Sequence, residues 1–489
     1  AEQRAKRIGS IRFLGPLLTE CTAVAGSSFP AHVIMYADVR YTAVLFYIAS
    51  ALRCRPAERG VPMTETAAPD YHQMWAELGL DLPTHDALLQ AVGSMYGDAY
   101  LTQANRPKGT DYLDFVLSEV HGLRIKELAD FRKSGGKVFG TFCLYVPEEI
   151  IRAAGGWNVG LCAGAEFAYD QVEQIMPRNT CALIKSATGF KLAKVCPYFE
   201  SSDLVIGETT CDGKKKAYEL LGKMHNVWVM ELPQMKRPED LAMWKAEIRN
   251  LVKKAEETTG TTITAESLRA AITEVNDKRR ALRRIAATCT ADPAPISGKD
   301  RLLATQVAFY DDVPRFTQMM NALADELEQR VANGQGVAPK GAKRILVTGT
   351  PMALPNWKLH DIIEKSGAVV VAEEMCTGSR YYTKLVAEDG ESVDAMLDDI
   401  AEKYLDINCA CFTPNQGRID DVIQMAKDYH ADGVIDISLQ FCGLYEMESH
   451  NVEQAVRDAG FPVLKITTDY SMEDVGQLST RIEAFLEML

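Results

Sequence analysis

Cysteines recur at the ends of short apolar runs, and this spacing constrains the fold more than any other feature of the chain. Cys211 follows the run 204–207, Leu-Val-Ile-Gly, and precedes the helix-forming segment KKKAYELLGKM. A short β-branched run of this kind is typical of a buried parallel strand. A cysteine between a strand's carboxyl end and a helix's amino end lies where α/β sheets bind ligands. The helix dipole and free N–H groups there favour a thiolate, which suits a metal, a nucleophile or a redox couple.

The alternation of strands and helices predicts an α/β protein with two doubly wound parallel-sheet domains of the Rossmann or flavodoxin type. We expect the first of these domains at residues 123–235 and the second at residues 341–489. Residues 236–340 have helical periodicity without strand signals and predict a helical bridge. Residues 1–122 are expected to form a mainly helical N-terminal extension, with Cys21 and Cys54 as buried small hydrophobes.

Composition and charge exclude several classes of function. The 489 residues carry a net charge of −14, so a nucleic-acid partner is not expected. The apolar run Tyr41–Leu52 is below spanning length, which predicts a core helix and not a membrane anchor. No secretory signal pattern opens the chain, so we expect a cytoplasmic protein without a disulfide framework. Twelve cysteines in that setting indicate metal or redox chemistry.

The two α/β units are internal repeats of one another. VGLCAGAEF, with Cys162, resembles VVAEEMCTGSRY, with Cys376. PRNTCALIKS corresponds to DINCACFTPN, and SDLVIGETTCDGKKKAYE corresponds to ADGVIDISLQFCGLYEME. The match breaks at Cys143, where the second unit has Thr350. Three matched cysteine positions in the same order indicate a duplicated binding unit.

Thiolates select iron–sulfur clusters, zinc or copper(I). Three thiolates at one sheet edge suit an iron–sulfur cubane with one iron open to an outside ligand. Zinc remains a rival, although the CxxC pairs of zinc ribbons are missing and Cys409 and Cys411 have a single spacer. The remaining alternative is that these cysteines are ordinary core residues.

The segments PRNTCALIKSATGF, CPYFESSDLVIGETTCDGKKKAYE, CTGSR, CACFTPN and the FCGLYEMES region resemble the 2-hydroxyacyl-CoA dehydratase/benzoyl-CoA reductase superfamily. Within it, they are most similar to the homodimeric double-cubane cluster protein branch. The resemblance covers residues 123–489. It implies a two-domain subunit with an 8Fe–9S double-cubane cluster, where other members of the superfamily hold one 4Fe–4S cubane.

The resemblance also implies the ligands, with three cysteines from each half of the repeat. Cys196 or Cys162 remains an alternative in the first half, and Cys411 an alternative to Cys409 in the second. The implied ligands are Cys143, Cys181, Cys211, Cys376, Cys409 and Cys442.

The function implied is that of a cluster-bearing component of an ATP-dependent two-component reductase that acts on small unsaturated substrates. The chain contains neither a P-loop nor a G-x-G-x-x-G motif, so the driving force is expected from a separate ATPase activator with its own iron–sulfur cluster. One alternative is a subunit of a 2-hydroxyacyl-CoA dehydratase or benzoyl-CoA reductase with one 4Fe–4S cluster. Another is a non-catalytic electron carrier.

Four other features carry weaker hypotheses. The run Lys214–Lys216 is either a solvated helix turn, a partner-steering patch or a charge that offsets the thiolates. Glu148 and Glu149 are either proton donors beside Cys143 or dipole-matched acids at a helix start. Arg380 binds an anionic substrate or makes a local salt bridge, and His450 is expected at the surface.

Overall fold

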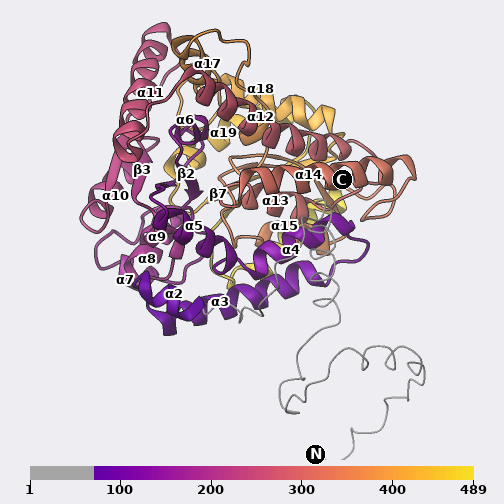
Figure 1. The fold of residues 1–489 in the computed structure, drawn as a ribbon. Coiled ribbons are helices and arrows are strands. Elements are labelled where there is room, and N and C mark those ends of the chain that lie inside the picture. Colours follow the sequence, from indigo (N-terminus) through magenta and orange to yellow (C-terminus); the bar gives the residue numbers. More distant parts are fainter. Residues whose placement is uncertain (1–70) are drawn as a thin grey trace, which may run out of the picture. The chain divides into compact units, whose positions relative to one another are not determined.

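The computed structural model describes residues 71–489, which lie within one compact unit (Figure 1). The expected core helix Tyr41–Leu52, Cys21 and Cys54 lie outside the described residues. The described chain is α/β with two parallel sheets and a helical region before the first strand, which confirms the predicted fold class.

The helices before the first strand are fixed by local capping and by buried ion pairs. Helix α3 begins where the Asp81 side chain accepts a hydrogen bond from the Thr84 N–H, with a proline in its first turn. Arg106 pairs with Asp300 at 2.7 Å and so anchors the region to a helix far along the chain. The elements are α2 (Tyr71–Glu77), α3 (Leu82–Tyr96), η3 (Gly97–Leu101), η4 (Lys108–Thr110), α4 (Asp111–Ser118) and α5 (Leu123–Lys133).

The first sheet has four parallel strands in the order β2-β1-β3-β4. All five residues of its inner strand β3 are buried, as its short apolar sequence predicts. The strands are β1 (Val138–Thr141), β2 (Trp157–Gly160), β3 (Leu204–Glu208) and β4 (Val227–Met230). The connecting helices are α6 (Glu148–Ala153), α7 (Tyr169–Val172), α8 (Ala182–Leu192), α9 (Pro197–Ser201) and α10 (Asp212–Leu221).

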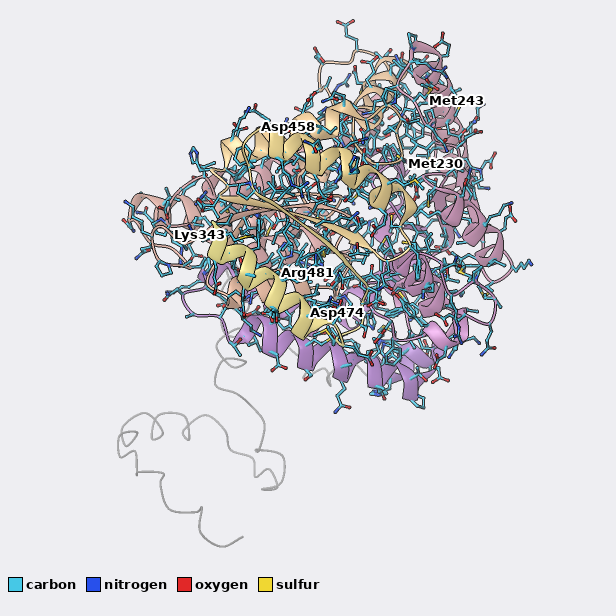
Figure 2. The ribbon with its side chains drawn as sticks, turned by 180° about the vertical axis from the view of Figure 1, so that it is seen from behind. Met230, Met243, Lys343, Asp458, Asp474 and Arg481 are labelled. Carbon is cyan, nitrogen blue, oxygen red and sulfur yellow. The ribbon has the colours of Figure 1, made fainter. Side chains whose placement is uncertain are left out.

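The second sheet has four parallel strands in the order β6-β5-β7-β8. Figure 2 shows α19, which ends at Asp458, and α20, which contains Arg481, on opposite sides of these strands. The strands are β5 (Arg344–Gly349), β6 (Val369–Glu374), β7 (Gly433–Leu439) and β8 (Val463–Thr468). The helices are α15 (Lys358–Lys365), α16 (Ser379–Tyr382), α17 (Val393–Leu405), α18 (Gln416–Asp428), α19 (Gly443–Asp458) and α20 (Val475–Met488).

Both sheets have the same strand order, which is the arrangement that the internal repeat predicts. In each sheet the chain reverses its direction of growth between two inner strands, β1 and β3 in one and β5 and β7 in the other. Gly349 ends β5 with φ 131°, and a Cβ there would lie 1.9 Å from the Ile437 carbonyl oxygen. Only glycine therefore permits this close approach at the second switch point. Ligands of doubly wound sheets bind at such points.

Four helices lie between the two sheets in the sequence: α11 (Pro238–Thr259), α12 (Ala265–Thr288), α13 (Gly298–Val307) and α14 (Val313–Ala332). Helix α12 contacts α6 of the first unit and α16 and α17 of the second. It therefore links the two halves of the molecule. A search of the helices in residues 71–489 finds none with the length and apolar character needed to cross a bilayer.

Candidate iron–sulfur site

The cysteines of the repeat lie where strands end and helices begin. Cys143 follows β1 and Cys376 follows β6. Cys211 and Cys442 are the residues directly before α10 and α19, and Cys181 is the residue directly before α8. The backbone N–H of Lys214 donates to the Cys211 sulfur at 3.4 Å, as expected at a helix N-terminus.

One set of thiols, which we call the Cys376 group, consists of Cys143, Cys376, Cys409 and Cys411. The Cys376 thiol lies within hydrogen-bonding reach of Cys143 and Cys409. Cys409 is also hydrogen-bonded to Cys411. Hydrogen bonds from Cys376 and Cys411, with Arg380 nearby, hold the pKa of Cys409 well below its usual value. The hydrogen bond to Cys409 and burial raise the pKa of Cys411 well above it. Its neighbours therefore favour the thiolate at Cys409 more than at Cys411.

A second set, the Cys181 group, consists of Cys181, Cys211 and Cys442. A hydrogen bond from Cys442, followed by backbone N–H groups of Leu183 and Ile184, lowers the pKa of Cys181 to about 7. Cys211 lies close enough to act electrostatically on Cys442. The Ala182 N–H donates to the Gln440 carbonyl at 3.3 Å, which ties the start of α8 to the loop before Cys442.

Each group combines cysteines from both halves of the chain. The sequence predicts one trio from each half, but the structure brings Cys143 to the second-half cysteines and Cys442 to the first-half ones. Contacts between the halves explain this exchange. The Tyr145 hydroxyl donates to the Ile407 carbonyl at 3.2 Å, and the Thr413 N–H donates to the Gln234 carbonyl at 2.9 Å. These bonds hold the loop with Cys409 and Cys411 against the first half.

The alternative ligands Cys162 and Cys196 differ in position. Cys162 lines a cavity with Cys143, and its thiol donates to the Phe142 carbonyl at 2.8 Å. Burial raises the pKa of Cys162 to about 12, so it is a neutral thiol. Cys196 packs against an apolar cluster that contains Phe190, and burial raises its pKa to about 11. Cys196 is not among the thiols that contact either group.

The cavity beside the Cys376 group has a volume of about 120 Å³. Cys143, Cys162 and Cys376 are among the residues that line it. Its other walls include apolar side chains and one cation, among them Phe142, Phe309, Leu354 and Lys214. A cavity of this size accepts a molecule of few atoms, and apolar side chains make up much of its lining.

Lys214 differs from the two lysines that follow it. Its ammonium is paired with buried Glu208, whereas Lys215 and Lys216 form exposed pairs with Asp212 and Glu219. Burial raises the pKa of Cys211, and Lys214 opposes this rise. Lys214 also contributes to the lowered pKa of Cys181 and interacts electrostatically with Cys143. Its charge therefore faces thiols of both groups, which favours the charge-offset interpretation for this one lysine.

The other candidates from the sequence have structural partners. Glu148 pairs with Lys278 at 2.5 Å and Glu149 with Arg279 at 2.6 Å, all of them buried. Burial opposes ionisation, but Lys278 and Arg279 outweigh it and lower the pKa of Glu148 to about 2, so this acid does not hold a proton to donate. His450 is exposed, as expected.

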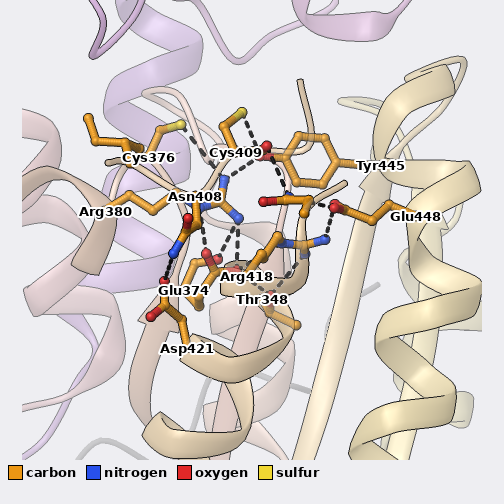
Figure 3. Close-up of polar contacts among 12 residues, drawn as sticks. Thr348, Glu374, Cys376, Arg380, Asn408, Cys409, Arg418, Asp421, Tyr445 and Glu448 are labelled. Atoms are coloured by element: carbon orange, nitrogen blue, oxygen red, sulfur yellow. Dashed lines mark hydrogen bonds and ion pairs between the residues drawn. The ribbon is translucent and has the colours of Figure 1, made fainter. Parts of the chain in front are cut away.

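Arg380 makes a local ion pair with Glu374, with Nη2 2.8 Å from Oε2 (Figure 3). It also points Nη1 at the Cys376 sulfur, 3.9 Å away. Sequence reasoning missed its neighbours Tyr445 and Arg418. Tyr445 lies three residues after Cys442 in the LYEMES motif, a helical spacing that is a usable signal. Arg418 has no such signal in the sequence.

The donor set fits an iron–sulfur group. Seven half-buried or buried thiols form two groups at helix starts and strand ends, and the Lys214 cation acts on thiols of both groups. Among residues 71–489, no three His, Cys, Asp or Glu side chains are placed to hold a single metal ion. A cluster of several irons is wider than one ion, so its thiolates need not meet at one point.

All the cysteines of both groups lie within the part of the chain that matches a known protein family. The chain belongs to the family of the 2-hydroxyglutaryl-CoA dehydratase D-component, whose model matches residues 143–489. This result confirms the superfamily that the cysteine motifs predict.

Several curated relatives cover most of the chain. YjiM of Escherichia coli (strain K12), whose assignment as a dehydratase subunit is itself inferred, is 40% identical over 375 residues, 76% of this chain and 96% of YjiM. The (R)-phenyllactyl-CoA dehydratase beta subunit of Clostridium sporogenes is 26% identical over 73% of this chain and 93% of its own length. One of the benzoyl-CoA reductase subunits of Thauera aromatica is 21% identical over 63% of this chain and 78% of its own length. Some of these relatives are thus named as dehydratase subunits, and one is named as a reductase subunit.

Proposed function

We propose that this protein is the iron–sulfur component of an ATP-dependent two-component reductase for small unsaturated substrates, with an 8Fe–9S double-cubane cluster. The observation that carries the proposal is the division of the thiols into two groups that both draw on both halves of the chain. The Cys376 group would hold one cubane through Cys143, Cys376 and Cys409, and the Cys181 group would hold the other. Cys409 is preferred to Cys411 because its neighbours stabilise its thiolate.

The bound cluster would supply one-electron chemistry at low potential. The chain's own residues set the conditions for it. Phe142, Phe309 and Leu354 give the cavity an apolar lining, and Lys214 offsets thiolate charge in a site where desolvation is strong. The small volume of the cavity favours a substrate of few atoms.

The proposal includes a separate partner. The sequence lacks a nucleotide-binding motif of the P-loop type, so an ATPase activator with its own iron–sulfur cluster would supply the electrons. We further propose a homodimer that works in the cytoplasm, where ATP is available to the activator.

A second candidate function is favoured by the names of the relatives. A subunit of a 2-hydroxyacyl-CoA dehydratase or a benzoyl-CoA reductase-type enzyme would hold one 4Fe–4S cluster and act on a thioester. It would need about four irons per chain and the double-cubane reductase about eight. A non-catalytic electron carrier would convert neither a small unsaturated substrate nor a thioester.

Turnover assays separate these functions. The anaerobically purified chain, with an activator of the same family, ATP and a low-potential reductant, is expected to reduce a two-carbon alkyne to the alkene. Omission of ATP is expected to abolish product, measured by gas chromatography. Dehydration of a 2-hydroxyacyl-CoA without alkyne reduction would instead establish the second function. Reversible one-electron reduction without turnover of either compound would establish a carrier.

A further inference from the structure

A buried guanidinium and a phenol reach two sulfurs of the Cys376 group, those of Cys376 and Cys409 (Figure 3). Arg380 directs Nη1 to the Cys376 sulfur at 3.9 Å and also to the Tyr445 hydroxyl. The Tyr445 oxygen lies 3.5 Å from the Cys409 sulfur. One arginine therefore serves two neighbouring sulfurs, one directly and one through the phenol.

The direction of these hydrogen bonds follows from chemistry. A guanidinium has donors and no acceptor, so the Tyr445 oxygen must accept from Arg380. The hydroxyl proton of Tyr445 is then free to point at the Cys409 sulfur. Cys376 and Cys409 thus both receive hydrogen bonds.

The donors are held in place by a second layer of charges. Glu374 accepts two bonds from the Arg380 guanidinium, and Arg418 donates to the same carboxylate at 3.2 Å. Arg418 in turn pairs with Glu448 at 2.6 Å. Both arginine side chains are almost fully buried, at 3% and 0% exposed. These ion pairs fix the orientation of the Arg380 guanidinium, so its hydrogen bond to the sulfur does not come from a flexible surface side chain.

The Cys181 group receives different donors. Backbone N–H groups of Leu183 and Ile184 bond Cys181, and the Lys214 N–H bonds Cys211. The Lys214 ammonium is paired with Glu208 and not with a sulfur. The two groups therefore differ in their donors: a charged side chain donates to a sulfur of the Cys376 group, whereas neutral backbone amides donate to Cys181 and Cys211. A charged donor makes a stronger hydrogen bond than a neutral amide.

We infer that Arg380 and Tyr445 are positioning residues that make the cluster position at Cys376 and Cys409 the more readily reduced of the two. The inference rests on the proposed function, since it compares two cluster positions. Hydrogen bonds to the ligand sulfurs stabilise added negative charge and so raise the reduction potential. The more readily reduced position is then the one beside the cavity that Cys143 and Cys376 line.

Anaerobic redox titration followed by electron paramagnetic resonance tests this inference on the iron-loaded chain. The wild-type protein is expected to show two midpoint potentials. Tyr445→Phe removes the hydrogen bond to Cys409 and is expected to move the more positive midpoint to a more negative value, with the other unchanged. The spacing between the two midpoints should therefore narrow.

Tyr404→Phe is the matched control. Tyr404 accepts from Arg279 at 2.8 Å and donates to Glu149 at 2.8 Å, so it has the same arrangement without a thiol. It is expected to leave both midpoints in place. Unmoved midpoints in Tyr445→Phe, or an equal shift of both, would overturn the inference. A wild-type chain with about four irons would overturn the proposed function before any variant is compared. The comparison of reduction potentials at two cluster positions would then no longer apply.

Discussion

Replacement of Cys442 by alanine is expected to lower the bound iron from about eight to about four atoms per chain. Cys442 belongs to the Cys181 group, and its loss leaves two thiols there, Cys181 and Cys211. The Cys376 group retains all of its members. One cubane is therefore lost and the other kept, as measured by colorimetric iron and sulfide assays on anaerobically purified protein.

Cys376→Ala tests the other group and is expected to give the same partial loss. It leaves Cys143 and Cys409 as ligands, and the hydrogen bond to Cys409 and burial disfavour the thiolate of the remaining Cys411. The control is Cys196→Ala, because this cysteine packs against an apolar cluster with Phe190 and is not a member of either group. Circular dichroism of each variant separates loss of iron from loss of fold. Full iron in Cys442→Ala, with the native circular dichroism spectrum, would contradict the assignment of Cys442.

Arg279→Met is expected to lower the free energy of unfolding by about 3–5 kcal/mol, because it leaves a buried carboxylate without its cation. Arg279 and Glu149 are both fully buried, and Arg279 also donates to Tyr404 at 2.8 Å. These residues come from α12, α6 and α17, so the pair ties the two halves together. Chemical denaturation of the iron-free chain measures the change.

Arg280→Met is the matched control on the next residue of the same helix. Arg280 pairs with Asp277 and Glu388 at the surface, with 41% of its side chain exposed, and its loss should cost about 0–1 kcal/mol. The double variant Glu149→Gln with Arg279→Met is expected to recover part of the stability, since no buried charge remains unpaired. Equal destabilisation by Arg279→Met and Arg280→Met would contradict the importance of the buried pair.

The sequence predicts the architecture because the architecture depends on local patterns. Short buried runs such as Leu204–Glu208 define the strands, and the repeat predicts that both sheets share one strand order. Proline followed by two acids marks the start of α6, which begins at Glu148. These signals act within a few residues, so they can be read without a structure.

The composition of the thiol groups depends on packing and was not predictable in the same way. Both halves of the repeat offer cysteines at strand ends, but contacts such as that of Tyr145 with Ile407 decide which of them meet. Which of Cys409 and Cys411 has the lower pKa depends on hydrogen bonds between thiols of distant segments and on the charge of Arg380. Arg418, on the helix after the Cys411 loop, reaches Glu374 only because α18 packs against β6.

Anomalous scattering at the iron edge, from a crystal grown without oxygen, tests the central claim most directly. We predict two neighbouring sets of irons, one bonded to Cys143, Cys376 and Cys409 and the other to Cys181, Cys211 and Cys442. Iron at only one group, or a different element at these sulfurs, would contradict the account.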